Sequence, residues 1–149
     1  MLNDYFYNNI GINSISIIST LKENNKKLEL TKVFLIMPLI SHNELLNYLS
    51  NNNINIHSLD NLIVNKNSCF VNFNKRFYQS IIQTINAIQY LIDVEIIKLE
   101  KNKIVLLKEI TYDKRMGRRA EKIYKASKNI SNILNESNEK LYLNLRVEL

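Results

Sequence analysis

The sequence contains very few of the residues that make sharp turns or covalent bridges. Its 149 residues include two glycines, one proline and one cysteine. A single cysteine excludes an intramolecular disulfide and is typical of a protein from a reducing compartment. Because so few residues favour turns, we expect most of the chain to form regular helices and strands.

The same shortages exclude several chemistries. With glycine only at positions 11 and 117, the chain has neither a glycine-rich phosphate loop nor a dinucleotide fingerprint. His42, His57 and Cys69 lack the spacing of a zinc site. A cysteine nucleophile at Cys69 would need a histidine and an orienting group beside it, and we treat this as a minor alternative. We therefore expect no metal, no cofactor, no small-molecule substrate and no catalysis.

Long hydrophobic runs are also missing. The longest apolar run covers residues 33–40, whereas a helix that crosses a bilayer needs about 20 residues. The first nine residues are polar and aromatic, without the basic region of a signal peptide. We expect a soluble, cytoplasmic protein that makes no membrane contact.

The most regular pattern lies between residues 72 and 108. Five apolar residues recur at spacings of three and four, which predicts one buried helical face: Phe77, Ile81, Ile85, Ile88 and Ile92. Residues 94–99 and 104–107 read as two strands around a polar turn at 100–103. A helix followed by a strand, a turn and a second strand is the second half of a winged-helix unit.

The N-terminal part, residues 12–64, is predicted to be helical. Residues 1–11 read as an irregular entry, followed by a helix capped by Asn13 or Ser14. Residues 28–40 fit either a buried helix or a buried strand, and Pro38 predicts that a helix would end or kink there. Ser41 and Ser58 are expected to cap two further helices.

The C-terminal part combines a helix with a strand. Residues 114–135 show an apolar seam at spacings of four and three: Met116, Ala120, Ile123, Ser127, Ile130 and Leu134. Residues 141–148 alternate strictly between apolar and polar, which predicts a terminal strand with one buried face. We therefore predict one domain over residues 1–149. Its fold class is α+β, mainly helical, with a winged-helix-like core whose helix and β-hairpin wing together cover 72–108, and with a C-terminal strand.

Positive charge is concentrated in one segment. The chain has a net charge of +6, and between residues 113 and 128 seven basic residues face two acidic ones, which gives +5. The basic residues are Lys114, Arg115, Arg118, Arg119, Lys122, Lys125 and Lys128. Such a helical face could bind DNA phosphates, dock on an acidic protein partner, or simply be solvated. We take these seven residues as the candidate DNA- or partner-binding site.

Several landmarks occur in an order that resembles a known family. The segment 34–42 contains Leu39 after Pro38, followed by His42, and a helix leading into a hairpin follows at 87–107. A basic helix at 118–132 and a terminal Leu145-Arg146-Val147 complete the pattern. These features resemble the middle component of three-component ABC (ABC-3C) systems, although Asn129-Ile130-Ser131 stands where a Gly-Trp pair is expected.

The resemblance implies a role as a small adaptor in prokaryotic defence, as in Lamassu-type anti-phage and anti-plasmid systems. The partners it implies are an SMC/ABC-type ATPase subunit and an effector subunit, such as a nuclease, with DNA passing nearby. The alternative is a freestanding winged-helix transcription regulator. Its recognition helix would be residues 74–91, with this polar side: Lys75, Arg76, Gln79, Gln83, Asn86 and Gln89.

Overall fold

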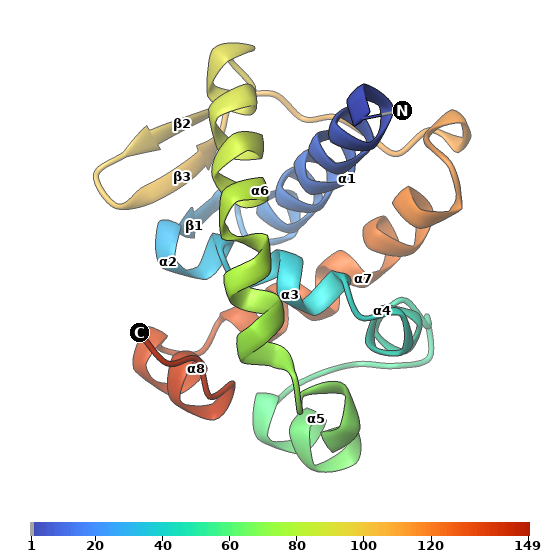
Figure 1. Cartoon of the computed structure of the whole chain (residues 1–149), viewed down its shortest axis with the longest axis vertical. Helices are drawn as coiled ribbons and strands as arrows, with labels where there is room; N and C mark the ends of the chain where they lie inside the picture. The colour runs from blue at the N-terminus through green and yellow to red at the C-terminus, as the bar shows by residue number, and fades with distance from the viewer. Residues whose placement is uncertain (1) are drawn as a thin grey trace.

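The computed structural model describes residues 2–149, with side chains from residue 10 onward (Figure 1). The α-helices are α1 (Leu2–Glu23), α2 (Leu30–Val33), α3 (Ile36–Ile40), α4 (Asn43–Leu49), α5 (Leu59–Asn65), α6 (Phe73–Asp93), α7 (Arg118–Leu134) and α8 (Asn138–Asn144). The strands are β1 (Lys27–Glu29), β2 (Ile97–Glu100) and β3 (Lys103–Leu106), and two 3-10 turns are η1 (Asn67–Cys69) and η2 (Lys114–Met116). The predicted class, α+β and mainly helical, is confirmed.

Three long helices organise the hydrophobic core. Helix α1 packs against both α6 and α7, and α3 fills the space beside α6. Ile17, Ile18 and Leu21 of α1 are buried, as the sequence pattern indicated. The expected irregular entry is wrong from residue 2 onward, and residue 1 lies outside the described part. Asn13 and Ser14 are buried inside α1 and do not cap it.

The sheet has three antiparallel strands in the order β1-β3-β2. The predicted hairpin is confirmed: β2 and β3 pair from Ile97 with Leu106 to Glu100 with Lys103, around a turn in which Lys101 adopts a φ of 54°. The third strand, β1, was not predicted, because only three residues form it. Its Leu28 is buried opposite Ile104 and closes the sheet over the core.

The hydrophobic segment after β1 forms two short helices and not one long helix or strand. The helical structure is interrupted between α2 and α3, at Phe34 and Leu35. Pro38 lies within the first turn of α3. The prediction that a helix would end or kink at Pro38 is therefore wrong, because the interruption lies before α3 and that helix continues through Pro38. A proline is tolerated there because the first N–H groups of a helix have no partner within the helix.

The caps of α4 and α5 follow ordinary helix chemistry. Ser58 caps α5 as predicted, accepting a hydrogen bond from the backbone N–H of Asn61 at 3.4 Å. The cap of α4 is His42 and not Ser41, since the backbone N–H of Leu45 donates to Nδ1 of His42 at 3.2 Å. The helix therefore begins one residue later than expected, and Ser41 ends α3.

The buried face of α6 is rotated from the one that the isoleucine spacing indicated. Phe77 and Ile88 are buried, but Ile85 is 49% exposed. The residues that face the core are large toward both ends of the helix and small in its middle: Phe73, Phe77, Ser80, Thr84, Ala87, Ile88 and Leu91. Small residues at the contact allow helix backbones to approach one another closely, which a row of isoleucines would prevent.

The predicted C-terminal strand is wrong, because residues 138–144 form helix α8. Ser137 caps this helix by accepting a hydrogen bond from the backbone N–H of Lys140 at 3.2 Å. Leu141 and Leu145 are buried, whereas Leu143 is 77% exposed. Two leucines four residues apart satisfy both a strand and a helix period, so the alternation alone could not separate the two.

Candidate binding surfaces

The basic segment is divided by a backbone break that its sequence does not reveal. Gly117 adopts a φ of 97°, a conformation that L side chains rarely take, and it separates η2 from α7. Arg115 consequently lies in η2, where its Nη2 atom pairs with Oδ2 of Asp113 at 2.9 Å. This pairing holds the pKa of the Asp113 carboxyl below its usual range. The prediction of one continuous helix over 114–135 is wrong at this end.

The remaining helix, α7, presents its other basic residues to solvent and buries the predicted seam. Five of the six seam residues are buried: Ala120, Ile123, Ser127, Ile130 and Leu134. Met116 is the exception, because it lies in η2 and is partly exposed. Lys125 pairs with Glu121 at 3.2 Å, and Lys114 and Lys128 are exposed. The amphipathic pattern therefore located the buried side of the basic helix correctly.

The first two turns of α7 and helix α4 enclose a basic notch. We define the notch by its six lining residues: Asn43, Leu46, Asn47, Arg118, Arg119 and Lys122. Its volume is about 350 Å³. Among the described residues, none of its three cations has an ion-pair partner, and no acidic residue lines it. The structure thus brings three of the seven predicted site residues together, opposite two asparagines that the sequence had not singled out.

An aromatic pair borders the basic segment. The rings of Tyr112 and Tyr124 stack with centroids 5.8 Å apart, and Nζ of Lys22 lies 5.9 Å from the Tyr124 ring. The stack covers only the inner face of each ring, and Tyr124 remains 37% exposed.

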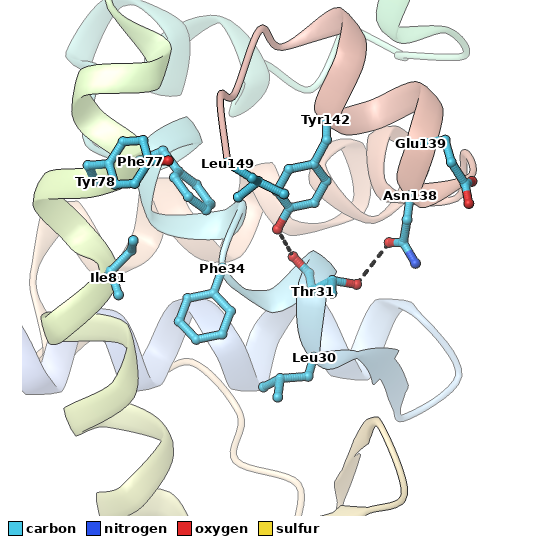
Figure 2. A pocket seen from close by; sticks show the side chains of 10 residues that line it. All are labelled: Leu30, Thr31, Phe34, Phe77, Tyr78, Ile81, Asn138, Glu139, Tyr142 and Leu149. Carbon is cyan, nitrogen blue, oxygen red and sulfur yellow. Dashed lines mark hydrogen bonds between the residues drawn. The ribbon is translucent and has the colours of Figure 1, made fainter.

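A second hollow, between α2, α6 and α8, is apolar. Its volume is about 520 Å³ (Figure 2). We call it the apolar groove, and its lining residues are Leu30, Thr31, Phe34, Phe77, Tyr78, Ile81, Asn138, Glu139, Tyr142 and Leu149. Figure 2 shows that these side chains come from three segments far apart in the sequence, so no local motif could have revealed the groove.

Hydrogen bonds fix one wall of the apolar groove. The hydroxyl of Tyr142 donates to the backbone carbonyl of Thr31 at 2.6 Å, and the Thr31 hydroxyl donates to Oδ1 of Asn138 at 2.9 Å (Figure 2). Burial raises the pKa of Tyr142 to about 12. The α2 and α8 sides of the groove are therefore held together by polar contacts at its rim.

Next to the groove, helix α6 exposes apolar side chains to solvent. Tyr78, Ile82 and Ile85 share one helical face and are 47%, 71% and 49% exposed. We call these three residues the α6 stripe. Tyr78 belongs to both the stripe and the groove, so the two form a continuous apolar surface. Sequence reasoning missed it because the isoleucine spacing assigned Ile85 to the core.

The polar side of α6 does not form one free row. Arg76 is occupied structurally: its Nε atom donates to the carbonyl of Pro38 at 3.0 Å and its Nη2 atom to that of Cys69 at 2.8 Å. Gln89 donates to Asp93 at 2.8 Å. Lys75 and Gln79 are exposed. Among these four residues of the proposed recognition helix, Lys75 and Gln79 are the two without such a contact.

The residues considered for nucleophilic or metal chemistry have separate roles. His42 caps α4, His57 is exposed, and Cys69 is buried. Burial, and secondarily the Glu44 carboxylate, raise the pKa of the Cys69 thiol. Among the side chains that the structure describes, from residue 10 onward, no cluster of three or more histidine, cysteine or acidic residues is placed to hold a metal ion. In the same part of the chain, no helix has the length and hydrophobicity to cross a bilayer.

The fold and its surfaces define a class: a small, mainly helical α+β protein that carries an apolar groove and a basic notch. Residues 7–149 match the family model MC3, the ABC-three component (ABC-3C) system Middle Component 3, and the chain belongs to this family. No curated protein and no solved structure matches the chain significantly. The resemblance drawn from the sequence landmarks is thereby confirmed at the level of the ABC-3C middle component.

Proposed function

We propose that this chain is a non-catalytic adaptor subunit of a prokaryotic defence complex of the Lamassu type. In this proposal it bridges an SMC/ABC-type ATPase subunit and an effector subunit, with its basic face toward DNA. Membership of a middle-component family implies other components with which the chain works. The observation that carries the proposal is the continuous apolar surface made by the groove and the α6 stripe.

The apolar surface supports a protein partner on energetic grounds. Burying a large apolar side chain stabilises an interface by about 1.5 to 3 kcal/mol, so Ile82 and Ile85 left in water are unfavourable for an isolated chain. Contiguous exposed apolar patches are typical of surfaces that bind other proteins. Tyr78 and Tyr142 add aromatic groups of the kind that are enriched at interface centres.

The two surfaces lie on different sides of the molecule, which supports a bridging role. In Figure 1, α2 and α8 lie on one side of α6, and α4 lies on the other side. The apolar groove is bounded by α2, α6 and α8, whereas the basic notch is bounded by α4 and α7. One partner on the apolar surface would therefore leave the basic face accessible.

The order of elements also supports a winged-helix-like core as part of the proposal. Helix α6 leads into the β2–β3 hairpin, and β1, which follows α1, completes a sheet in the order β1-β3-β2. A freestanding winged-helix regulator is the alternative that this order favours. A recognition helix, however, reads bases with polar side chains, whereas on α6 the apolar stripe lies among the exposed polar residues and interrupts them. We therefore favour the adaptor.

The proposal is tested by co-expressing the tagged chain with the ATPase and effector subunits of its system. The double variant Ile82→Lys/Ile85→Lys places charges on the stripe, where both side chains are already exposed. We expect it to fold and to lose co-purification of at least one partner. The matched control is Val64→Lys/Val71→Lys, which makes the same change at two exposed valines away from the stripe.

Two results would contradict the adaptor. Unchanged co-purification of both subunits with the stripe variant would show that the apolar surface takes no part in the assembly. A purified wild-type chain that forms a dimer and binds a short palindrome, with no affinity for the other subunits, would identify the regulator instead.

A further inference from the structure

We infer that the basic notch between α4 and α7 binds backbone phosphates of duplex DNA. This inference deepens the proposed adaptor function and rests on it for its setting in the complex. The notch is a distinct site within the basic segment, because Arg115 is paired with Asp113 and Lys125 with Glu121. Its three cations have no such partner in the described part of the chain.

The placement of these cations is unfavourable for the isolated protein. Arg118 and Lys122 are four residues apart on α7, so their like charges repel across one helical turn. Arg118 and Arg119 also lie in the first turn of α7, where the helix dipole disfavours positive charge. Local rules of this kind are most often broken at functional sites. An anion in the notch would relieve both unfavourable interactions.

The shape and donors of the notch favour a phosphate group. Its volume of about 350 Å³ lies within the usual range of small-ligand pockets. Arginine forks bind phosphate oxygens through two parallel hydrogen bonds, and asparagine amides commonly contact DNA phosphates. Arg118 and Arg119 on one wall and Asn43 and Asn47 on the other supply both kinds of donor.

The surroundings favour duplex DNA over a single strand or a free nucleotide. Binding of single strands relies on aromatic side chains that stack with bases, and the residues described along the notch, from residue 10 onward, include no aromatic one. From Arg118 to Lys128 the helix rises about 15 Å, a length over which a duplex carries on the order of nine phosphate charges. Lys128, exposed on α7, extends the basic surface along the helix beyond the notch.

The test measures DNA affinity of the full chain against salt concentration, with a labelled 24-base-pair duplex of mixed sequence. The notch variant is Arg118→Gln/Arg119→Gln/Lys122→Gln. The charge-matched control is Lys75→Gln/Lys101→Gln/Lys108→Gln, whose lysines are exposed and lie on α6 and around the hairpin. We expect the notch variant to bind roughly tenfold or more weakly, and its salt slope to fall by about 2 to 3. The control should bind within about threefold of wild type.

Further measurements separate the possible outcomes. Thermal unfolding of the notch variant should be unchanged or improved, because the substitutions remove repulsion. Equal loss in both variants, a larger loss in the control, or no duplex binding by the wild type at low salt would overturn the inference. Preference for the single strand or for ATP as a competitor would also overturn it.

Co-expression distinguishes this inference from the adaptor proposal. If the notch variant keeps its duplex affinity but no longer co-purifies with the ATPase or effector subunit, the notch binds an acidic protein surface. The phosphate inference then fails, whereas the adaptor proposal stands. If the notch variant loses the duplex and keeps both subunits, both are supported.

Discussion

The backbone N–H of Ile56 donates a hydrogen bond to Oδ1 of Asn129 at 3.0 Å, which joins the α4–α5 loop to α7 across 73 residues. The amide nitrogen of Asn129 completes the contact by donating to the carbonyls of Leu49 at 2.9 Å and Ile54 at 3.0 Å. One buried side chain therefore satisfies three backbone groups: the carbonyl of the last residue of α4 and two groups of the loop that follows it. This loop follows α4, which forms one wall of the basic notch.

Replacement of Asn129 by alanine should destabilise the protein by about 2 to 4 kcal/mol. The substitution leaves one buried N–H and two carbonyls without their partner, and such groups cost more than a hydrogen bond contributes on average. Urea unfolding followed by circular dichroism measures the change. Asn132→Ala, on the same helix and half-buried, is the control and should stay within about 0.5 kcal/mol of wild type. Equal stability of the two variants would contradict this role.

Arg76 should act as a structural residue and not as a DNA contact. Its guanidinium links α6 to the carbonyls of Pro38 and Cys69 and lies 5.4 Å from the Phe73 ring. Because lysine cannot reproduce this fork, we expect Arg76→Lys to lower the free energy of unfolding by about 1 to 3 kcal/mol. Urea denaturation measures this, with Lys75→Gln as a control that should be neutral. A stable Arg76→Lys variant with reduced duplex affinity would indicate the recognition helix of a regulator instead.

The protein should become less stable in alkaline solution, because the buried phenol of Tyr142 resists ionisation. The folded state raises the pKa of this phenol to about 12 through burial, whereas in the unfolded chain it titrates near 10. The contribution of the neutral Tyr142 phenol to the free energy of unfolding is fully present below pH 10. It is lost as pH rises from about 10 to 12, since the unfolded state releases its proton first.

The measurement compares wild type with Tyr142→Phe between pH 8 and pH 11. Phenylalanine cannot ionise, so the difference in unfolding free energy should shift in favour of the variant at pH 11. Tyrosine ionisation followed near 295 nm as a difference spectrum reports the same group. Parallel pH dependence of the two proteins would show that Tyr142 titrates normally in the folded state.

Cys69 should be unreactive in the folded protein. The thiol is buried, and burial raises its pKa, so the thiolate that reacts with alkylating agents is scarce at pH 8. We expect iodoacetamide to react with Cys69 at least about 100-fold more slowly in the native protein than in concentrated urea. The thiol must first be exposed by unfolding, and each factor of ten in rate corresponds to only about 1.4 kcal/mol of unfolding free energy. Fast labelling of the native chain, or an activity lost in Cys69→Ala, would reopen the cysteine-enzyme alternative.

Much of the fold followed from local patterns that have one structural solution. The seam of α7 from Ala120 to Leu134 and the hairpin around Lys101 were predicted correctly, since a long 3.6-residue period and a polar turn between apolar runs are distinctive. Predictions failed where a pattern fitted both the strand period and the helix period. Leu141 and Leu145 fit a strand as well as a helix, and the cap at Ser137 decided for the helix.

The candidate site, like the fold, could be predicted only in part from the sequence. The sequence located the basic segment, because charge is a property of composition and does not depend on folding. It could not separate Arg115 from Arg118, since the positive φ of Gly117 and the pairing with Asp113 appear only in the folded backbone. Nor could it place Asn43 and Asn47 opposite Arg119, because α4 and α7 meet only through tertiary packing.

The sequence by itself determined the mainly helical class, the concentration of positive charge and the likeness to ABC-3C middle components. Only the tertiary structure decided that Ile82 and Ile85 stay in solvent and that an apolar groove opens between α2, α6 and α8. Periodicity shows which residues of a helix share a face. Which face is buried depends on the side chains that neighbouring helices supply, and here the small residues Ser80, Thr84 and Ala87 of α6 face the core.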